Sequence, residues 1–280
     1  MRSHPPTLQT HARRMLEKEL RVPRGARILV ATSGGPDSQA LLDVLASLRK
    51  PLGLVIHAHG IDHGLRETAS AELDLAEALA GHLDVPFRRT LLRVAEGSNL
   101  QARARTARYQ ALEAAAEGGL IATGHQADDR AETVLLRLLR GAGPRGLAVL
   151  PPQADHRIRP LLRATRADVL AHLERHHLAY ATDPSNRSTR FLRTRVRHEL
   201  LPLLSALSPQ IVAHLCALAD QLGAVAKGDP PVIFPRATQD AMLRLLAHPT
   251  DTCEILLPGG LVLGRRRTQV MKKTKKSPAS

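Results

Sequence analysis

Aromatic residues are scarce in this chain of 280 residues, which has no tryptophan, three phenylalanines and two tyrosines. Proteins that bind single-stranded nucleic acid often stack bases on rows of aromatic side chains, and so few aromatic residues cannot build an extended platform of that kind. If the chain binds nucleic acid, recognition must therefore rest on arginine, lysine and the backbone.

Cysteine and long apolar runs are also rare. Cys216 and Cys253 are the only cysteines, and they lack the paired spacing of a zinc or iron–sulfur site. Two cysteines cannot staple a domain of this length, so both are expected to be reduced. Residues 1–14 lack an apolar signal core, and no later run is long enough to span a bilayer. These absences predict a soluble, cytoplasmic protein with no membrane partner.

Positive charge, by contrast, is abundant. Forty lysines and arginines against 26 aspartates and glutamates give a formal net charge of +14. A field of this size attracts polyanions and makes nucleic acid the first candidate partner. An arginine-rich composition without a polyanion partner explains the same excess, so charge alone does not decide between the two.

Short apolar runs alternate with segments of helical periodicity in the first half of the chain. Residues 28–31 are typical of a buried strand, and a glycine-rich turn and a helix with apolar residues from Ala40 to Leu48 follow. The pattern continues with strands at residues 54–59, 87–92 and 120–123 and helices at residues 67–83, 100–117 and 128–140. This alternation predicts an α/β fold, a parallel sheet with helices on both faces, whose ligands bind beyond the carboxyl ends of the strands.

A change of composition near residue 150 predicts a domain boundary. Residues 1–26 are interpreted as an N-terminal helix and lead-in, residues 27–150 as the α/β domain, residues 151–228 as an arginine-rich helical region, residues 229–268 as a small helix plus hairpin, and residues 269–280 as a basic disordered tail. In the helical region, helices are predicted at residues 165–176, 193–204 and 209–226, with Pro209 at the first position of the last one. Further on, a helix is expected at residues 238–246 and a hairpin at residues 254–264.

The turn after the first strand has the composition of a phosphate-binding loop, and its residues are Ser33, Gly34, Gly35, Pro36, Asp37 and Ser38. Adjacent glycines let the backbone N–H groups face an anion, the helix N-terminus adds partial positive charge, and the serine hydroxyls can donate hydrogen bonds. No lysine follows the glycines, so this is not a Walker A loop. A carboxylate among phosphates is reasonable where it helps to hold Mg²⁺, which makes Asp37 the metal candidate. A plain glycine turn with a helix-capping side chain is the alternative.

The segment SGGPDS resembles the SGGxDS loop of the PP-loop ATPases, or N-type ATP pyrophosphatases. Further segments between residues 27 and 204 resemble the tRNA(Ile)-lysidine synthases: DHGLR at 62–66, NLQA at 99–102, GHQADDRAET at 124–133, LLRLLRG at 135–141, DPSN at 183–186 and RTRVR at 193–197. The resemblance implies a PP-loop ATPase domain with a parallel sheet that binds an adenine nucleotide, followed by a smaller, mostly helical region.

Carboxylates crowd one end of the helix that follows the fourth predicted strand. Asp128 and Glu132 are four residues apart and Asp129 and Glu132 three, so they can share a face. With the resemblance, they become candidates to bind a lysine ammonium or Mg²⁺; compensation of the helix dipole on a solvated face is the alternative. Arg105 is the candidate to neutralise departing pyrophosphate, weakly preferred over Arg108, one turn away. His63 and His125 also follow strands, but neither is named as a general base.

Arginines are densest just before the last large helices, at positions 187, 190, 193, 195 and 197. Arg190, Arg193 and Arg197 share one helical face, and with Arg195 they form the candidate tRNA-backbone patch, which would position RNA without reading its bases. A second basic patch at residues 265–276 could bind phosphate or be a solvated tail.

The resemblance implies an ATP-dependent, Mg²⁺-requiring ligase that joins L-lysine to the wobble cytidine of isoleucine tRNA with a CAU anticodon. The cytidine would be adenylated first, and lysine would then displace AMP to give lysidine. A 2-thiocytidine-type enzyme of the same fold and a non-catalytic basic RNA-binding protein are the alternatives. Thr194 stands where the family usually has asparagine, and little more than 70 residues follow Leu204. We therefore expect the tRNA contact surface to be smaller than is usual in the family, or to be shared between the two chains of a homodimer.

Overall fold

The computed structural model describes residues 6–62, 68–92, 100–182, 191–226, 254–257, 261–266 and 269–274. The chain divides into two compact units, Met1–Lys227 and Gly228–Ser280. The first unit contains both the sheet and the helices that follow it, so residues 27–150 and 151–226 belong to one compact body. Among the described residues, no single helix is long and apolar enough to cross a bilayer. The segments Leu192–Leu207 and Ile211–Ala226 reach the necessary length and apolar content only when taken together, and they are bent by 100° relative to each other.

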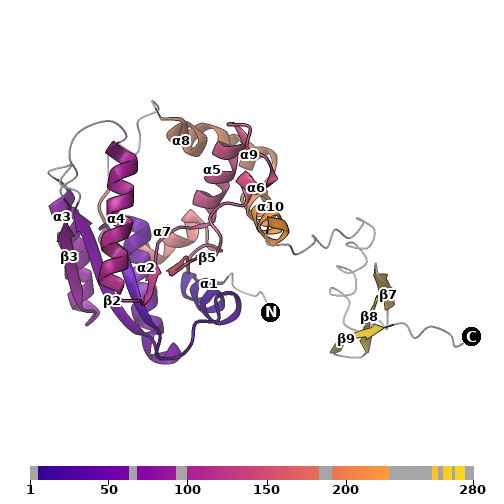
Figure 1. Cartoon of the computed structure of the whole chain (residues 1–280), viewed down its shortest axis with the longest axis horizontal. Helices are drawn as coiled ribbons and strands as arrows, with labels where there is room; N and C mark the ends of the chain where they lie inside the picture. The colour runs from indigo at the N-terminus through magenta and orange to yellow at the C-terminus, as the bar shows by residue number, and fades with distance from the viewer. Residues whose placement is uncertain are drawn as a thin grey trace, which may run out of the picture. The chain divides into compact units, whose positions relative to one another are not determined.

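A twisted sheet lies at the centre of the first unit (Figure 1). In the described part of the chain its strands are β1 (Arg27–Thr32), β2 (Val55–Asp62), β3 (Phe87–Leu91), β4 (Leu120–Ala122), β5 (Gln153–Ala154) and β6 (Arg157–Ile158), in the order β3-β2-β1-β4-β6-β5. All neighbours pair in parallel except β5 and β6. Because β1 and β4 are neighbours, the turns that follow them lie side by side at one edge of the sheet.

Helices cover both faces of the sheet: α1 (Leu8–Arg14), α2 (Pro36–Leu52), α3 (Thr68–His82), α4 (Leu100–Ala116) and α7 (Arg166–Arg175). Successive side chains of β1 point to opposite faces of the sheet. Ile28 and Val30 pack with α1, α2 and α7 on one face, and Leu29 and Ala31 pack with α4 on the other. Pro36 begins α2, and Gly53, at φ +62°, ends it in the left-handed conformation.

A second hydrophobic core joins the remaining helices of this unit: α5 (Ala127–Leu138), α6 (Pro144–Leu147), α8 (Leu192–Arg195), the π-helical turn η3 (Val196–Leu200), α9 (Leu201–Leu207) and α10 (Ile211–Ala226). Val134 of α5, Val196 and Leu215 meet in this core. The buried Arg130 also pairs with Asp220 of α10 at 2.7 Å. These contacts fix α8 and η3 beside the beginning of α5.

The α/β architecture and the parallel sheet are confirmed, with differences in detail. The hairpin β5–β6 was not expected, and β6 extends the sheet beyond residue 150. Helix α10 begins at Ile211, so the prediction that Pro209 occupies its first position is wrong by two residues; Pro209 lies in the preceding turn. The helix predicted at 238–246 lies outside the described residues.

The second unit contains a small antiparallel sheet, β7 (Glu254–Leu257), β8 (Leu261–Arg266) and β9 (Gln269–Thr274), in that order. Strands β7 and β8 confirm the predicted hairpin. Strand β9 corrects the expectation of a disordered tail beginning at residue 269, because Val262 is aligned with Lys273 and Gly264 with Met271 in the ladder. Pairing with a neighbouring strand thus orders a segment whose lysines alone suggested disorder.

Candidate active site at the carboxyl edge of the sheet

The loop from Ser33 to Ser38 connects β1 to α2 in a compact turn. Gly34 has φ +72°, and a Cβ atom there would collide with the carbonyl oxygen of Glu72 in α3. The hydroxyl of Ser38 accepts a hydrogen bond from Ser33 N over 3.1 Å and donates one to Gly35 O over 2.9 Å. Glycine is therefore required at position 34 on both conformational and steric grounds.

Asp37 stands in the first turn of α2 and faces the loop that follows β4. Gln126, which is 1% exposed, donates from Nε2 to Asp37 Oδ1 over 2.9 Å. Burial, reinforced by the nearby carboxylate of Asp129, raises the pKa of Asp37 to about 6, although Arg166 and Arg197 oppose the shift. A bound cation would favour the ionised carboxylate at this position.

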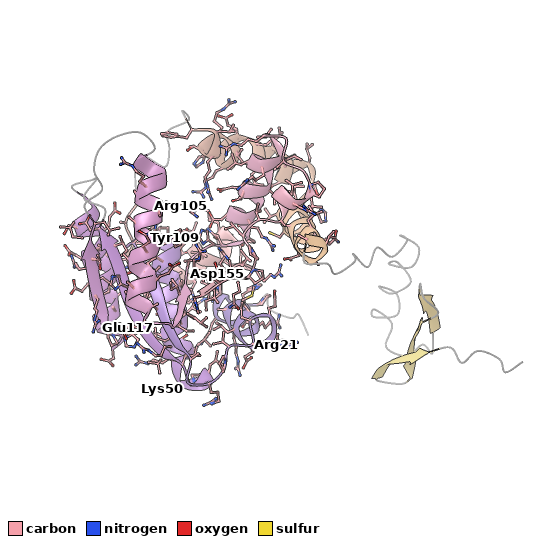
Figure 2. All side chains as sticks on the ribbon, in the orientation of Figure 1. Arg21, Lys50, Arg105, Tyr109, Glu117 and Asp155 are labelled. Carbon is pink, nitrogen blue, oxygen red and sulfur yellow. The ribbon has the colours of Figure 1, made fainter. Side chains whose placement is uncertain are left out.

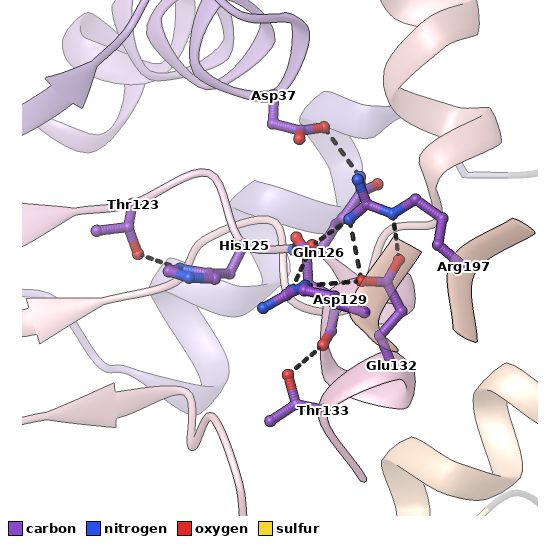
Figure 3. Close-up of polar contacts among 9 residues, drawn as sticks. Asp37, Thr123, His125, Gln126, Asp129, Glu132, Thr133 and Arg197 are labelled. Atoms are coloured by element: carbon purple, nitrogen blue, oxygen red, sulfur yellow. Dashed lines mark hydrogen bonds and ion pairs between the residues drawn. The ribbon is translucent and has the colours of Figure 1, made fainter. Parts of the chain in front are cut away.

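The acidic cluster and the arginine patch, predicted as separate features, form one ion-pair network (Figure 3). Arg197 donates to Glu132 Oε1 over 2.5 Å and to Glu132 Oε2 over 3.0 Å, and it reaches Asp129 Oδ1 at 3.2 Å. Arg193 donates to Glu132 Oε2 over 3.1 Å and to Asp129 Oδ1 over 3.3 Å. The side chain of Glu132 is only 2% exposed, so both arginines neutralise a buried charge.

Two of the predicted residues in this region lie apart from that network. Asp128 accepts a hydrogen bond from the backbone N of Arg166 over 2.8 Å, at the beginning of α7, so its carboxylate faces away from Glu132's partners. Arg195 is exposed and pairs with Glu199 at 3.0 Å, one helical turn away. Asp128 and Glu132 were expected to share one helical face, but their carboxylates have different partners. Arg195 pairs with Glu199 and not with the acidic cluster.

Helix α4 supplies the opposite wall of the site. A cavity of about 210 Å³ is lined by Ser33, Asp37, Ser38, Arg105, Arg108, Tyr109, Thr123, Gly124, His125, Asp129 and Arg193, among others. Figure 2 shows Arg105 and Tyr109 one turn apart on α4, and the guanidinium of Arg105 lies 5.1 Å from the Tyr109 ring centroid. Arg108 is more buried than Arg105, and desolvation lowers its pKa. The cavity thus brings the loop after β1 together with two guanidinium groups of α4 and with that of Arg193.

His125 lies inside the same cavity. Its Nδ1 is 2.9 Å from the hydroxyl of Thr123. Burial, followed by the positive charges of Arg159 and Arg105, lowers the pKa of His125 to about 3, so the imidazole is neutral at physiological pH. A neutral ring can donate one hydrogen bond and accept another, but it adds no charge to an already cationic wall.

Several predicted residues come together here and others cannot be placed. One cavity is lined by Ser33 and Ser38 of the loop together with Asp37, Arg105, Asp129 and Arg193. Its position agrees with the expectation that ligands bind beyond the carboxyl ends of the strands. Arg190 and the segments at 63–66 and 183–186 lie outside the described residues. The sequence analysis did not name Gln126 as a site residue, although its side chain joins the loop after β1 to the loop after β4. The available signal was its position between the end of a strand and the acidic first turn of the next helix.

Comparison with known proteins agrees with this geometry. A family model described as a PP-loop domain matches residues 7–204. The tRNA(Ile)-lysidine synthase of Synechococcus sp. is 37% identical over 222 residues, covering 76% of this chain and 68% of the relative. The chain belongs to the tRNA(Ile)-lysidine synthase family of PP-loop proteins. The predicted family and fold are therefore confirmed.

Two further comparisons concern the length of the relatives that the chain matches and the fold that it shares with a solved structure. The tRNA(Ile)-lysidine synthase of Rhodopseudomonas palustris is 41% identical over 214 residues, which cover 72% of this chain but 60% of that protein. The solved U34-tRNA thiolase NcsA from Methanococcus maripaludis matches with a TM-score of 0.66 at 20% identity, over 77% of this chain and 78% of that one. That likeness shows the shared fold alone. The chain thus spans about three fifths to two thirds of the two synthases.

Proposed function

We propose that this family member catalyses ATP-dependent ligation of L-lysine to the wobble cytidine of isoleucine tRNA with a CAU anticodon. The observation that carries the proposal is the single cavity that unites the Ser33–Ser38 loop with Asp37, Arg105 and Asp129, in a chain 37% and 41% identical to proteins named for that product. Phosphate-binding and acidic groups are both needed, because the reaction combines a nucleotide with a cationic amino acid.

In this proposal, the loop and α4 contact the ATP phosphates from opposite sides of the cavity. The turn at Gly34 and Gly35 and the N-terminus of α2 would bind the phosphate chain, and the serine hydroxyls would add hydrogen bonds. Arg105 and Arg108, on the opposite wall, would neutralise the charge that develops as pyrophosphate leaves. The lack of a loop lysine agrees with attack at the α-phosphate rather than the γ-phosphate.

The residues present fit a divalent cation at Asp37. Its carboxyl group is buried next to a second carboxylate, Asp129, and burial, followed by repulsion from Asp129, raises its pKa. Oxygen ligands of this kind suit Mg²⁺, which would supply positive charge against the nucleotide phosphates when bound. Asp37 would hold the ion, and Gln126 would orient Asp37 through its hydrogen bond to Oδ1.

The acidic cluster offers a place for the lysine ammonium. Asp129 lines the cavity, and its Oδ1 is shared with Arg193 and Arg197 at 3.3 and 3.2 Å. Arg193 is half exposed, so it can be displaced from Asp129 by another cation at little desolvation cost. Glu132 accepts hydrogen bonds from Arg197 on both carboxylate oxygens and from Arg193 on Oε2, so its role in this proposal is to orient the two arginines.

The proposed chemistry proceeds in two steps. The cytidine O2 attacks the α-phosphate of ATP, the bond to the β-phosphate breaks, and pyrophosphate leaves. The ε-amine of lysine then attacks C2, loses a proton and expels AMP, which leaves lysidine. The exposed Arg195 would contact the tRNA backbone, a contact that positions RNA without reading its sequence.

Nucleoside mass spectrometry tests the proposal directly. The full chain is incubated with ATP, Mg²⁺, isotopically labelled lysine and isoleucine tRNA of CAU anticodon, and the digested tRNA is analysed for labelled lysidine. Parallel reactions replace lysine by sulfide or ammonia, and a methionine tRNA with the same anticodon serves as the matched substrate control. Labelled lysidine in the isoleucine tRNA alone is the expected result, whereas a sulfur-containing nucleoside or no modified nucleoside would refute it.

A further inference from the structure

Two histidines and an aspartate lie together where α7 packs against α2. His172 Nε2 is 2.8 Å from Asp43 Oδ2, and the rings of His172 and His176 have centroids 4.3 Å apart at an interplanar angle of 30°. One ligand atom from each of these three residues falls within 4.8 Å of the others. The cluster is separate from the cavity that holds Asp37, whose lining includes none of the three.

The two helices create this arrangement by their periodicity. His172 and His176 are four residues apart at the end of α7, so they lie one above the other on a single face. Asp43 comes from the middle of α2, which packs against α7. His172 is 5% exposed and the Asp43 side chain 13% exposed, whereas His176 is exposed. The cluster is thus buried on one side and open to solvent on the other.

This ligand set has the chemistry of a borderline divalent metal. Imidazole nitrogens suit Zn²⁺, Co²⁺, Ni²⁺ and Cu²⁺, whereas Mg²⁺ and Ca²⁺ prefer oxygen ligands alone. Ligands at about 2.0–2.1 Å from a tetrahedral zinc ion are about 3.3–3.4 Å from one another. The 2.8 Å between His172 Nε2 and Asp43 Oδ2 therefore needs only a small separation of the two side chains.

We propose that Asp43, His172 and His176 form a binding site for Zn²⁺ or a similar borderline transition metal. Three protein ligands leave a fourth position, and the solvent exposure of His176 allows water to occupy it. In binding, the metal replaces the hydrogen bond between Asp43 and His172, so the two ligands stay connected through the ion.

The site would join two helices that both begin at the carboxyl edge of the sheet. Asp43 is six residues after Asp37 on α2, about 9 Å along the helix axis. At the other end of α7, the backbone of Arg166 donates to Asp128. A metal between α2 and α7 would therefore stabilise the packing of α7 against α2, the helix that carries Asp37, without contacting the nucleotide.

Metal binding and thermal unfolding test the proposal without measuring catalysis. Zinc binding to the metal-free full chain is measured by isothermal titration, and visible absorption of the Co²⁺ form reports imidazole ligands. One equivalent should bind the wild-type chain and raise its unfolding temperature. In the variant His176→Gln, which removes the exposed ligand, we expect zinc affinity to fall by at least the roughly 10- to 100-fold that loss of an outer-shell partner costs. The thermal stabilisation by zinc should be lost.

His214→Gln is the matched control, because His214 is an exposed helical histidine on α10, outside the cluster. It should bind zinc as the wild type does. Asp43→Asn supplies a second test at a partly buried ligand and should weaken zinc binding while the amide keeps a hydrogen-bond acceptor toward His172. Equal zinc affinity in the wild type and His176→Gln, or no binding at all, would overturn the site. Asp37→Asn should leave it intact, so failure here is distinct from failure of the proposed ligase function.

Discussion

Gln126 Nε2 donates a hydrogen bond to Asp37 Oδ1 over 2.9 Å and thereby joins the turns that follow β1 and β4. The backbone N of the same glutamine donates to Asp129 Oδ2 over 3.2 Å. One buried residue therefore sets the position of both carboxylates that face the cavity. Since β1 and β4 are adjacent in the sheet, this bridge is a direct product of the strand order.

The pKa of Asp37 predicts a pH-dependent stability difference in the absence of ligands. The pKa rises from its ordinary value of 3.8 to about 6 in the folded chain, so the folded state binds the proton more tightly than the unfolded state. The associated stability is present below about pH 3.8 and is lost as pH rises through about 6. Asp37→Asn, which cannot ionise, should therefore exceed the wild type in unfolding free energy by up to about 3 kcal/mol at pH 7.5.

Urea unfolding of both proteins from pH 4 to 7.5 measures this difference. The gap between Asp37→Asn and the wild type should be small near pH 4 and grow as the pH rises. Asp155→Asn is the matched control, since the Asp155 side chain is 78% exposed, and it should show no such trend. A gap that stays constant with pH would mean that Asp37 titrates normally.

The buried charge of Glu132 predicts a structural role for Arg197. Arg197→Met leaves a 2% exposed carboxylate with Arg193 as its one remaining partner in this network, and we expect the free energy of unfolding to fall by about 2–4 kcal/mol. Arg195→Met is the control, because its exposed pair with Glu199 contributes less than about 1 kcal/mol. Equal small losses by urea denaturation would show that Arg197 does not stabilise the fold.

Local signals were enough to predict the position of the glycine-rich turn from Ser33 to Ser38. Apolar periodicity indicated β1 and α2, and the glycine pair between them indicated tight backbone geometry; Gly34 at φ +72° is consistent with that interpretation. The placement of the acidic helix after β4 followed from the same strand–helix alternation. These features depend on neighbours close in sequence, which is why the sequence alone was sufficient.

Contacts between distant segments were beyond the reach of such reasoning. Arg197 and Glu132 are 65 residues apart, and neither residue's spacing indicates the other as a partner. Asp128 and Asp129 are adjacent in sequence but about 100° apart around a helix, so one carboxylate faces Arg197 and the other accepts from Arg166. Which one faces the cavity depends on the packing of α5 against α7 and α8.

The close approach of α3 to the loop predicts that Gly34 tolerates no side chain. In Gly34→Ala, both the positive φ and the collision with the Glu72 carbonyl are unfavourable. Gly25→Ala is a matched control, because Gly25 also has positive φ, +82°, but no neighbouring atom within 4 Å of the added Cβ. We expect Gly25→Ala to lose about 1 kcal/mol of stability and Gly34→Ala to lose more and to bind ATP at least about 10-fold more weakly. Similar ATP affinities in calorimetric titrations would contradict the steric argument.

The cavity wall on α4 predicts that Arg105 acts on the reaction rather than on the fold. Arg105 is exposed and lines the cavity together with Ser33 and Ser38, whereas Arg103, two residues earlier on α4, is not among the lining residues. We expect Arg105→Gln to reduce tRNA- and lysine-dependent pyrophosphate release by roughly 10²-fold, the usual effect of removing one preorganised donor from a developing anion. Arg103→Gln should keep nearly full activity, and both variants should unfold in urea close to the wild-type midpoint. If the two variants lose activity equally, the charge of α4 acts only as a general attraction for RNA, and Arg105 has no specific role at the departing phosphate.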